Sequence, residues 1–278
     1  MAADGDTGLP HQLNFYNDFV RSNKERTVVI ISDAMRYEVG RSLFEKLQAD
    51  AKCTTSISAM QSVLPSYTKF GMAALLPHNT IEVLPDSRTL ADGKPTDDIK
   101  QREAVLQAAN PDSRCVKYDD IKSMNVSALR DVFTGQNVVY VYHDQIDARG
   151  DHASTENEVF NACEEAVEEI YFLVRKLTSS ANTIHYIITA DHGFIYKRDK
   201  LSESDKISGI PDADRRYALT DRDVQGEGVA SLPFSSIIGA DDSRRVYFPM
   251  GSDLFKKPGS GLNYTHGGSS PQAVSYTH

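Results

Sequence analysis

The chain has 278 residues and a mass of 30.8 kDa, the size of one large globular domain or of one domain with an insertion. Its 39 acidic residues outnumber its 30 basic residues, which gives a formal net charge of −9. This balance excludes an extended, non-specific grip on nucleic-acid backbone, because such a grip requires clustered positive charge. It does not exclude a nucleotide in a site where bound metal supplies the positive charge.

Cysteine usage and hydropathy predict a cytoplasmic protein that does not engage a membrane. Cys53, Cys115 and Cys163 are odd in number and far apart, which excludes a disulfide framework and a CxxC metal site. No apolar run approaches the ~20 residues that a membrane span requires. Residues 1–8 lack the basic and apolar regions of a signal peptide.

Predicted helices and strands alternate through the first half of the chain. Residues 11–23 have the spacing of one amphipathic helix, within a lead-in over 1–26. Thr27–Asp33 (TVVIISD) is a β-branched run typical of a strand buried on both faces of a parallel sheet. The next predicted elements are helices over 37–51, 68–76, 97–109 and 121–133, a weak strand over 54–58 and a short strand over 81–84.

Two more strong strands follow, over 137–144 (NVVYVYHD) and 183–191 (TIHYIITAD), with a long helix over 154–177 between them. This alternation predicts an α/β fold with a mostly parallel central sheet and helices on both faces. Residues 194–265 have short β-like pieces and many turn residues, so we expect a loop-rich β excursion that forms a cap.

The expected domain covers residues 27–272, with the excursion inside it and a tail over 273–278. The excursion should return to the edge of the sheet near His266.

The three strong strands end in carboxylates. Asp33 closes the first, Asp144 and Asp147 follow the second, and Asp191 closes the third. Because ligands bind at the carboxyl ends of parallel strands, these side chains should converge at one edge. The alternative for any one of them is a helix cap, but three at one edge favour a metal site.

Asp191-His192-Gly193 is the sharpest local signal. Gly193 permits an immediate turn after the strand, so both preceding side chains can face one cation. Imidazole and carboxylate are the ligands expected for Zn²⁺ or Mn²⁺. The alternative is a capping Asp beside a surface His.

The loop Asp147-Ala-Arg-Gly-Asp151-His152 has a second ligand-like spacing. The two aspartates, with a glycine between them, are able to wrap a second cation. The alternative is the start of a helix, with Asp151 or Ser154 as the N-cap.

Thr68 lies at the start of a predicted helix, after an extended lead-in imposed by Pro65. A hydroxyl in this position is commonly a cap. Beside a divalent cation, however, it becomes a nucleophile, and the helix N–H groups behind it bind phosphate oxygens. The sequence leaves both alternatives open. His266, in a glycine-rich segment, is either a surface residue or a late ligand that completes the site.

The order Asp33, Thr68, Asp147, Asp191-His192, His266 resembles the alkaline phosphatase superfamily, and within it the PglZ family of BREX phage-defence systems. The motifs that carry the resemblance extend from residue 28 to residue 272 and are IISDAMRYEV, LPSYTKFGMAALLPH, YVYHDQIDARGD, ITADHGFIY and VYFPMGSDLFKKPGSGLNYTHGGSSPQ.

The resemblance implies a site with two divalent ions, Zn²⁺ or alternatively Mn²⁺. One ion and the nucleophile match Asp33, Thr68, Asp191 and His192, and the other ion matches Asp147 and His266. Relatives often have Asp-x-x-x-His in the middle motif. The third ligand of the second ion is therefore either Asp151, which keeps the spacing and is preferred, or His152.

The implied activity is hydrolysis of phosphoric esters through attack by Thr68 on phosphorus. The net charge favours nucleotides and short or cyclic oligonucleotides, hence a phosphodiesterase. Lys69 and Arg36 either bind phosphate oxygens or are solvated helix charges. Metal affinity should fall below about pH 6, because ligating histidines must be neutral.

Other classes are a phosphomonoesterase and a non-catalytic or weakly catalytic metal-binding scaffold in a complex of phage-defence proteins. A sulfatase is disfavoured because its cysteine motif is missing, and a mutase because the chain is short. Relatives often have Glu or Met where this chain has Ala273, which suggests a piece or short form of a longer protein.

Overall fold

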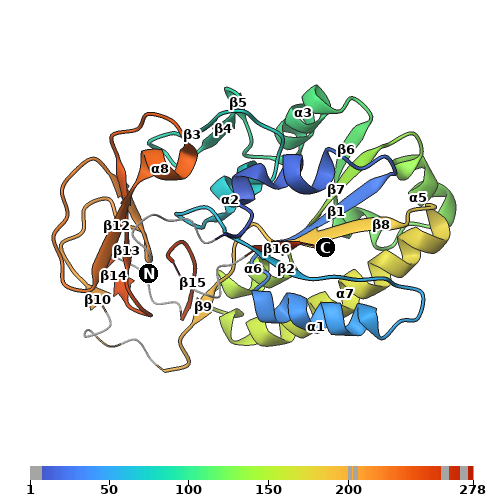
Figure 1. Cartoon of the computed structure of the whole chain (residues 1–278). Coiled ribbons are helices and arrows are strands. Elements are labelled where there is room, and N and C mark those ends of the chain that lie inside the picture. The colour runs from blue at the N-terminus through green and yellow to red at the C-terminus, as the bar shows by residue number, and fades with distance from the viewer. Residues whose placement is uncertain (1–7, 200–201, 203–205, 258–262, 270–274, 278) are drawn as a thin grey trace.

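Four parallel strands form the central sheet of the computed structural model, which describes residues 8–199, 202, 206–257, 263–269 and 275–277. The strand order is β6 (Ser113–Lys117), β7 (Val138–His143), β1 (Thr27–Ser32) and β8 (His185–Thr189) (Figure 1). The three strong predicted strands are confirmed and lie side by side. β6 was not predicted, because its sequence SRCVK carries too few apolar residues to stand out.

One face of the sheet is covered by α1 (Tyr37–Gln48), α5 (Val126–Phe133) and α7 (Val159–Ser180), as Figure 1 shows for α1 and α7. Val28 and Ile30 of β1 are fully buried on this side. Alternate residues of a strand point to opposite faces, so the residues next to Val28 and Ile30 in the chain face a second core.

The opposite face is covered by η2 (Tyr16–Val20), α2 (Thr68–Ala74) and α3 (Ile99–Ala109). Val29 and Ile31 of β1 are fully buried there. The continuous β-branched run is therefore explained by burial on both faces, and the predicted α/β fold with helices on both sides is confirmed.

The N-terminal segment differs from the single helix predicted over residues 11–23. It forms a 3-10 turn, η1 (Gln12–Asn14), and a short π-helix, η2. The Gln12 backbone N–H donates to the carbonyl of Gln61. The Gln12 side chain is buried and donates to the carbonyl of Asp191. These tertiary hydrogen bonds override the helical periodicity.

Other boundaries also differ from the prediction. The helix expected over 121–133 is two helices, α4 (Tyr118–Ile121) and α5, because Asn125 caps a new start by accepting from Ala128 N. The strand expected over 54–58 begins only at Ser58, as β2 (Ser58–Met60). β2 pairs antiparallel with β16 (Ser275–Thr277), inside the expected tail. Residues 1–7, 270–274 and 278 of the expected lead-in, domain end and tail lie outside the described residues.

The remaining short elements connect the layers. They are β3 (Ile81–Val83), β4 (Thr89–Ala91) and β5 (Lys94–Pro95), which form one antiparallel sheet, and α6 (Gln145–Gly150) and η3 (Glu156–Glu158), which lie between β7 and α7.

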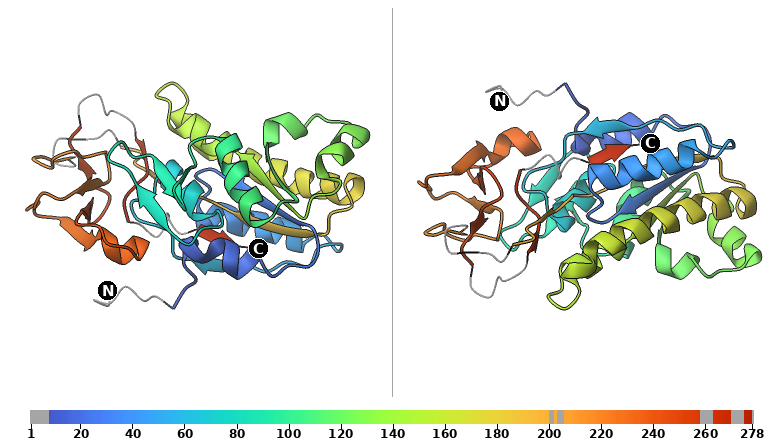
Figure 2. Two further views of the ribbon diagram at one scale, coloured as in Figure 1. Left: turned by 90° about the horizontal axis from the view of Figure 1, so that it is seen from above. Right: turned by 90° about the horizontal axis from the view of Figure 1, so that it is seen from below.

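The described residues between 194 and 265 form a separate layer beside the central sheet, at the left of Figure 1 and in both views of Figure 2. Its elements are β9 (Ile195–Tyr196), β10 (Lys206–Ile207), β11 (Ala218–Thr220), β12 (Val229–Pro233), α8 (Phe234–Ile238), β13 (Arg245–Pro249), β14 (Leu254–Phe255) and β15 (Tyr264–Thr265). The order β11–β13–β12 forms its antiparallel centre, and β15 returns along β9.

Two contacts fix this excursion to the rest of the chain. The buried guanidinium of Arg216 donates to the carbonyl of Ser269, beyond the end of the excursion, at 3.2 Å, and to that of Asp253, within the excursion, at 2.9 Å. Phe234 of α8 meets Phe70 of α2 edge to face at 5.8 Å between ring centroids. Of the helices in the described ranges, none has the length and apolar character needed to cross a membrane.

Candidate two-metal site and nucleophile

The carboxylates that follow the three strong strands converge at one edge of the sheet. Asp33 directly follows β1, Asp147 lies in the first turn of α6, and Asp191 comes just after β8. Three groups of side chains place ligand atoms within 4.8 Å of one another: Asp33, Asp191 and His192; Asp147, His192 and His266; and Asp33, Asp144 and Asp147. These groups contain all of the predicted metal ligands except Asp151, and they add Asp144.

His192 is the centre of the first group. Its Nε2 atom lies 3.4 Å from Asp33 Oδ1 and 3.5 Å from Asp191 Oδ2. The same Nε2 atom lies 3.0 Å from the Thr68 hydroxyl oxygen. One imidazole nitrogen, two carboxylates and the candidate nucleophile therefore face a single point.

Thr68 is the first residue of α2 but does not cap it. The N-cap position belongs to Tyr67, and no cap hydrogen bond from its side chain is present among the described residues. The Thr68 hydroxyl is directed to His192 instead of to the helix backbone. Of the two alternatives left open by the sequence, the cap is therefore disfavoured.

Gly71 lets α2 approach the end of β8. A Cβ atom at this position would lie 2.3 Å from the carbonyl oxygen of Asp191, closer than such contacts are found in proteins. The glycine thus permits the helix to hold Thr68 beside Asp191-His192.

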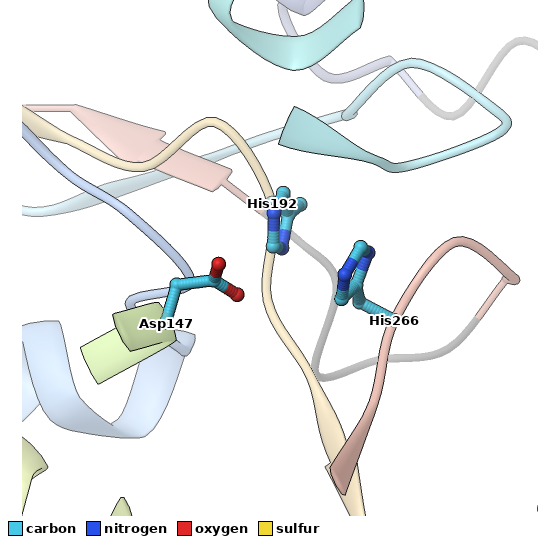
Figure 3. Close-up of side chains that lie close together, drawn as sticks. All are labelled: Asp147, His192 and His266. Atoms are coloured by element: carbon cyan, nitrogen blue, oxygen red, sulfur yellow. The ribbon is translucent and has the colours of Figure 1, made fainter. Parts of the chain in front are cut away.

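The second group joins segments that are far apart in the sequence. Figure 3 shows Asp147, His192 and His266 facing one another from α6, from the segment after β8 and from the segment after β15. The rings of His192 and His266 are stacked, with centroids 4.3 Å apart and planes 18° apart. The predicted return of the chain near His266 therefore brings that residue into the site.

Asp147 is held in place by Tyr264, whose hydroxyl donates to Asp147 Oδ1 at 2.7 Å. The ring of Tyr264 passes over Gly150, where a Cβ atom would lie 2.4 Å from it. The contact between Tyr264 and Asp147 was not predicted, because it joins β15 to α6 across 117 residues of sequence.

The donor set fits divalent cations. Asp33 Oδ1, Asp191 Oδ2 and His266 Nδ1 are buried and have no hydrogen-bond partner within the described part of the chain. Buried polar atoms are normally satisfied, so the unpaired carboxylate oxygens of the first group and the unpaired imidazole nitrogen of the second fit positively charged partners. Carboxylate oxygen and imidazole nitrogen are the expected ligands of Zn²⁺ and Mn²⁺.

The electrostatics of the site agree with the binding of divalent cations. Burial, with Asp191 and Asp147 nearby, raises the pKa of Asp33 well above its usual value. Burial and then Asp147 raise the pKa of Asp191 to about 7. Burial lowers the pKa of His192, and burial together with His192 lowers that of His266. Bound cations would hold the carboxylates ionised, while both imidazoles are already biased toward the neutral, ligating form.

The structure distinguishes the two candidates for the third ligand of the second ion. Asp151 ends α6 and lines the cavity in front of His266, although it lies outside the three close groups. The His152 ring is exposed and its Nδ1 atom is 2.9 Å from the carbonyl of Ala148, within its own helix region. The preference for Asp151 is therefore retained.

A cavity of about 490 Å³ opens over the site. It is lined by Tyr67, Thr68, Lys69, Ser87, Asp147, Asp151, Asp214, Arg215, Tyr217, Lys257, Thr265 and His266.

The two predicted phosphate-binding cations differ in position. Lys69 lines the cavity, with its Nζ atom 3.6 Å from Asp97 Oδ1. Arg36 is not part of the described lining. Its guanidinium pairs with Glu38 and lies over the ring of Phe194 at 5.0 Å. These contacts favour a structural role for Arg36.

Gln12 is a positioning residue that sequence reasoning missed. Its Nε2 atom donates to the carbonyl of Asp191 at 2.8 Å, and its Oε1 atom accepts from Val63 N at 2.9 Å. It thus ties the end of β8 to the segment that leads into α2. A single glutamine in a short amphipathic stretch carries no signal of this role.

Solved structures of ectonucleotide pyrophosphatase/phosphodiesterase 5 share the fold. Murine ectonucleotide pyrophosphatase/phosphodiesterase 5 superposes with a TM-score of 0.58 at 14% identity, covering 91% of this chain and 88% of that chain. The human protein gives 0.57 at 13% identity, over 91% and 87%. An inactive threonine-to-alanine variant of the murine protein, in complex with AMP, gives 0.56 at 14% identity, over 92% and 88%.

Closer relatives are found by sequence. The alkaline phosphatase-like protein PglZ of Bacillus cereus (strain H3081.97) is 39% identical over 274 residues, and BrxZ of Escherichia coli O9:H4 (strain HS) is 34% identical over 280. Both matches cover 96% of this chain and 32% of the relative, so the chain spans about a third of their length. Residues 14–275 match the family described as the BREX system PglZ alkaline phosphatase-like domain, and the chain therefore belongs to the PglZ family.

Proposed function

We propose that this domain is a two-metal phosphoric ester hydrolase, a phosphodiesterase that acts on nucleotides or short oligonucleotides with Thr68 as nucleophile. The observation that carries the proposal is the position of the Thr68 hydroxyl, 3.0 Å from His192 Nε2 and next to two buried carboxylates. A hydroxyl used only to cap α2 would not be directed into a group of candidate ligands.

Two sets of residues would hold the cations. Asp33, Asp191 and His192, with Thr68, form one set, and Asp147, Asp151 and His266 form the other. When bound, divalent ions such as Zn²⁺, or alternatively Mn²⁺, neutralise phosphate oxygens and favour the ionised form of a nearby hydroxyl.

The protein groups then have distinct tasks. The Thr68 oxygen forms a bond to phosphorus as the bond to the departing ester oxygen breaks. Solvent takes the hydroxyl proton of Thr68 and supplies a proton to the departing oxygen, which leaves as an alcohol. The resulting threonyl phosphate ester is cleaved by water, which restores the hydroxyl. Tyr264 keeps Asp147 in position, and Lys69, next to Thr68 at the cavity wall, binds phosphate oxygens.

The cavity supports a small substrate. Its volume of about 490 Å³ is in the range that holds a nucleotide-sized ligand, and the net charge of −9 disfavours long polyanions. The AMP complex of the murine structural neighbour supports the same class of ligand. Membership of the PglZ family supports action with other BREX defence proteins, and three free cysteines support a reducing cytoplasm.

The test compares wild type, Thr68→Ala and Thr68→Ser in hydrolysis of bis-p-nitrophenyl phosphate, with p-nitrophenyl phosphate as the monoester. We expect Thr68→Ala to lose activity by at least about a thousandfold and Thr68→Ser to retain part of it, because a hydroxyl is restored. Elemental analysis should find two metal ions per chain in wild type and metal retained in Thr68→Ala.

Two results would contradict the proposal. Hydrolysis by Thr68→Ala at the wild-type rate would show that Thr68 is not the nucleophile. A wild-type protein that binds two metal ions but turns over neither ester would favour the metal-binding scaffold.

A further inference from the structure

The outer wall of the cavity carries positive charge that the proposed reaction does not use. Arg215 and Lys257, both from the excursion, line the cavity together with Lys69. The carboxylates of the lining are Asp147, Asp151 and Asp214, and the first two are assigned to metal binding. Lys69 Nζ lies 3.6 Å from Asp97 Oδ1 and Lys257 Nζ lies 3.2 Å from Asp214 Oδ2, so each of the two lysines has a carboxylate partner.

Arg215 is only partly engaged by the protein. Its Nη1 atom donates to the carbonyl of Tyr264 at 3.3 Å, and lies 4.0 Å from Asp151 Oδ1, too far for a hydrogen bond. A guanidinium has five N–H donors, and within the described residues this one has a single protein acceptor. Its side chain is 22% exposed and borders the cavity, so the other donors have room for a ligand.

Arg215 also lies directly beside the candidate metal ligands. The residue whose carbonyl it contacts, Tyr264, is the one whose hydroxyl holds Asp147, and His266 follows two positions later. A substrate whose reacting phosphate lies at the metal site would therefore place a neighbouring group of the same molecule near Arg215.

We propose that Arg215 binds a second phosphate of the substrate, adjacent to the one that reacts, with Lys257 adding positive charge. A planar guanidinium matches the paired oxygens of a phosphate better than any neutral ligand group. The preferred substrates are then phosphodiesters with at least two phosphates, linked either along an oligonucleotide or as a pyrophosphate. This inference rests on the proposed function and deepens it.

Binding of thymidine phosphates to the zinc-loaded Thr68→Ala variant tests the second-phosphate site at Arg215 without turnover. Calorimetry compares thymidine 5′-monophosphate with thymidine 3′,5′-bisphosphate and thymidine 5′-diphosphate, which carry the second phosphate in the two alternative linkages. We expect at least one of the two to bind at least about tenfold more tightly than the monophosphate, because a hydrogen-bonded charge pair contributes this much. The tighter of the two identifies the linkage.

Adding Arg215→Gln should reduce that affinity ratio to about one. Arg222→Gln is the matched control, since Arg222 is another cation of the excursion, its side chain is 66% exposed, and it pairs with Asp212 outside the cavity lining. It changes the net charge equally and should leave the ratio unchanged.

The proposal is overturned if the affinity ratio is already about one in the Thr68→Ala protein that retains Arg215. It is also overturned if adding Arg215→Gln weakens the binding of all three ligands equally. The second result would mean that Arg215 only anchors the segment around Tyr264. Failure of the proposed function is separate, because it would appear as absent turnover of bis-p-nitrophenyl phosphate by wild type whatever the affinity ratio.

Discussion

The hydroxyl of Tyr264 is the most specific support that the structure provides for a candidate ligand. It donates to Asp147 at 2.7 Å, from a side chain that is completely buried. Hydrogen bonds of this kind fix the orientation of a metal ligand, and their loss typically weakens metal binding.

Tyr264→Phe should lower zinc affinity by about ten- to a hundredfold, since it removes this donor and keeps the ring. Zinc titration by calorimetry measures the effect. Tyr196→Phe is the matched control, because Tyr196 pairs with Tyr264 across the strands and its hydroxyl donates to Asn157 instead. Equal zinc affinity in Tyr264→Phe and Tyr196→Phe would contradict the role given to Tyr264.

The pH dependence of metal binding is set by carboxylates more than by histidines. The sequence led us to expect weaker binding below about pH 6 through protonation of His192 and His266. Burial lowers the pKa of both rings, which favours their neutral form and makes histidine protonation a weaker cause of metal loss. The pKa of Asp191 is raised to about 7, chiefly by burial, so its proton must leave when a cation binds.

Zinc affinity should therefore begin to fall as the pH drops below about 7, a unit higher than histidine protonation would predict. Calorimetric titrations at several values between about pH 5 and pH 8 would show this, and buffers of different ionisation heat would reveal the released protons. Affinity that is constant down to about pH 6 would exclude the carboxylate explanation.

At the scale of elements, α2 determines whether the nucleophile reaches its neighbours. The helix is short, and it is positioned by the contact of Gly71 with the backbone of Asp191. The substitution Gly71→Ala raises intrinsic helix propensity by up to about 1 kcal/mol. It also introduces a Cβ atom 2.3 Å from a carbonyl oxygen, and overpacking of this kind costs about 1–3 kcal/mol.

The clash should prevail, so Gly71→Ala is expected to lower both the free energy of unfolding and phosphodiester hydrolysis, as Thr68 moves away from His192. Denaturant unfolding and steady-state kinetics measure the two effects. Gly251→Ala is the control, since a Cβ at Gly251 meets no atom within 4 Å. A fully active Gly71→Ala would show that this approach is not required.

The elements also show what could be predicted from the sequence. β1, β7 and β8 stood out because burial on both faces demands uninterrupted β-branched residues, and the carboxylates at their ends followed. β6 was missed because its sequence SRCVK carries few apolar residues, and β2 was misplaced because it has only three residues. Gln12, Tyr264 and Arg215 were missed because their roles depend on contacts between distant segments.

At the scale of the whole molecule, the buried carboxylates connect metal binding to stability. Without a cation, the folded protein binds protons more strongly than the unfolded chain, because the pKa of Asp191 rises from 3.8 to about 7. The free energy of unfolding contributed by this group is therefore highest below about pH 4. It decreases as the pH rises toward 7, where the carboxylate must ionise in a buried site.

Chelation of the metal should consequently destabilise the protein more at about pH 7.5 than at about pH 5. Differential scanning calorimetry with EDTA and with zinc, at both pH values, measures the difference in Tm. Asp191→Asn should reduce the pH dependence of that difference. A metal-dependent Tm shift that is the same at both pH values would argue against ionisation of these carboxylates on binding.

His266 reaches the site only after the chain has completed the excursion, whereas Asp33 precedes the excursion in the chain. At roughly 5–20 residues per second of synthesis, the two are separated by roughly 10–50 seconds on the ribosome. Until Asp191 and His192 are made, a nascent chain lacks ligands of both proposed cations, and until His266 is made it still lacks one ligand of the second. A chain that terminates before His266 would therefore carry an incomplete second cation site.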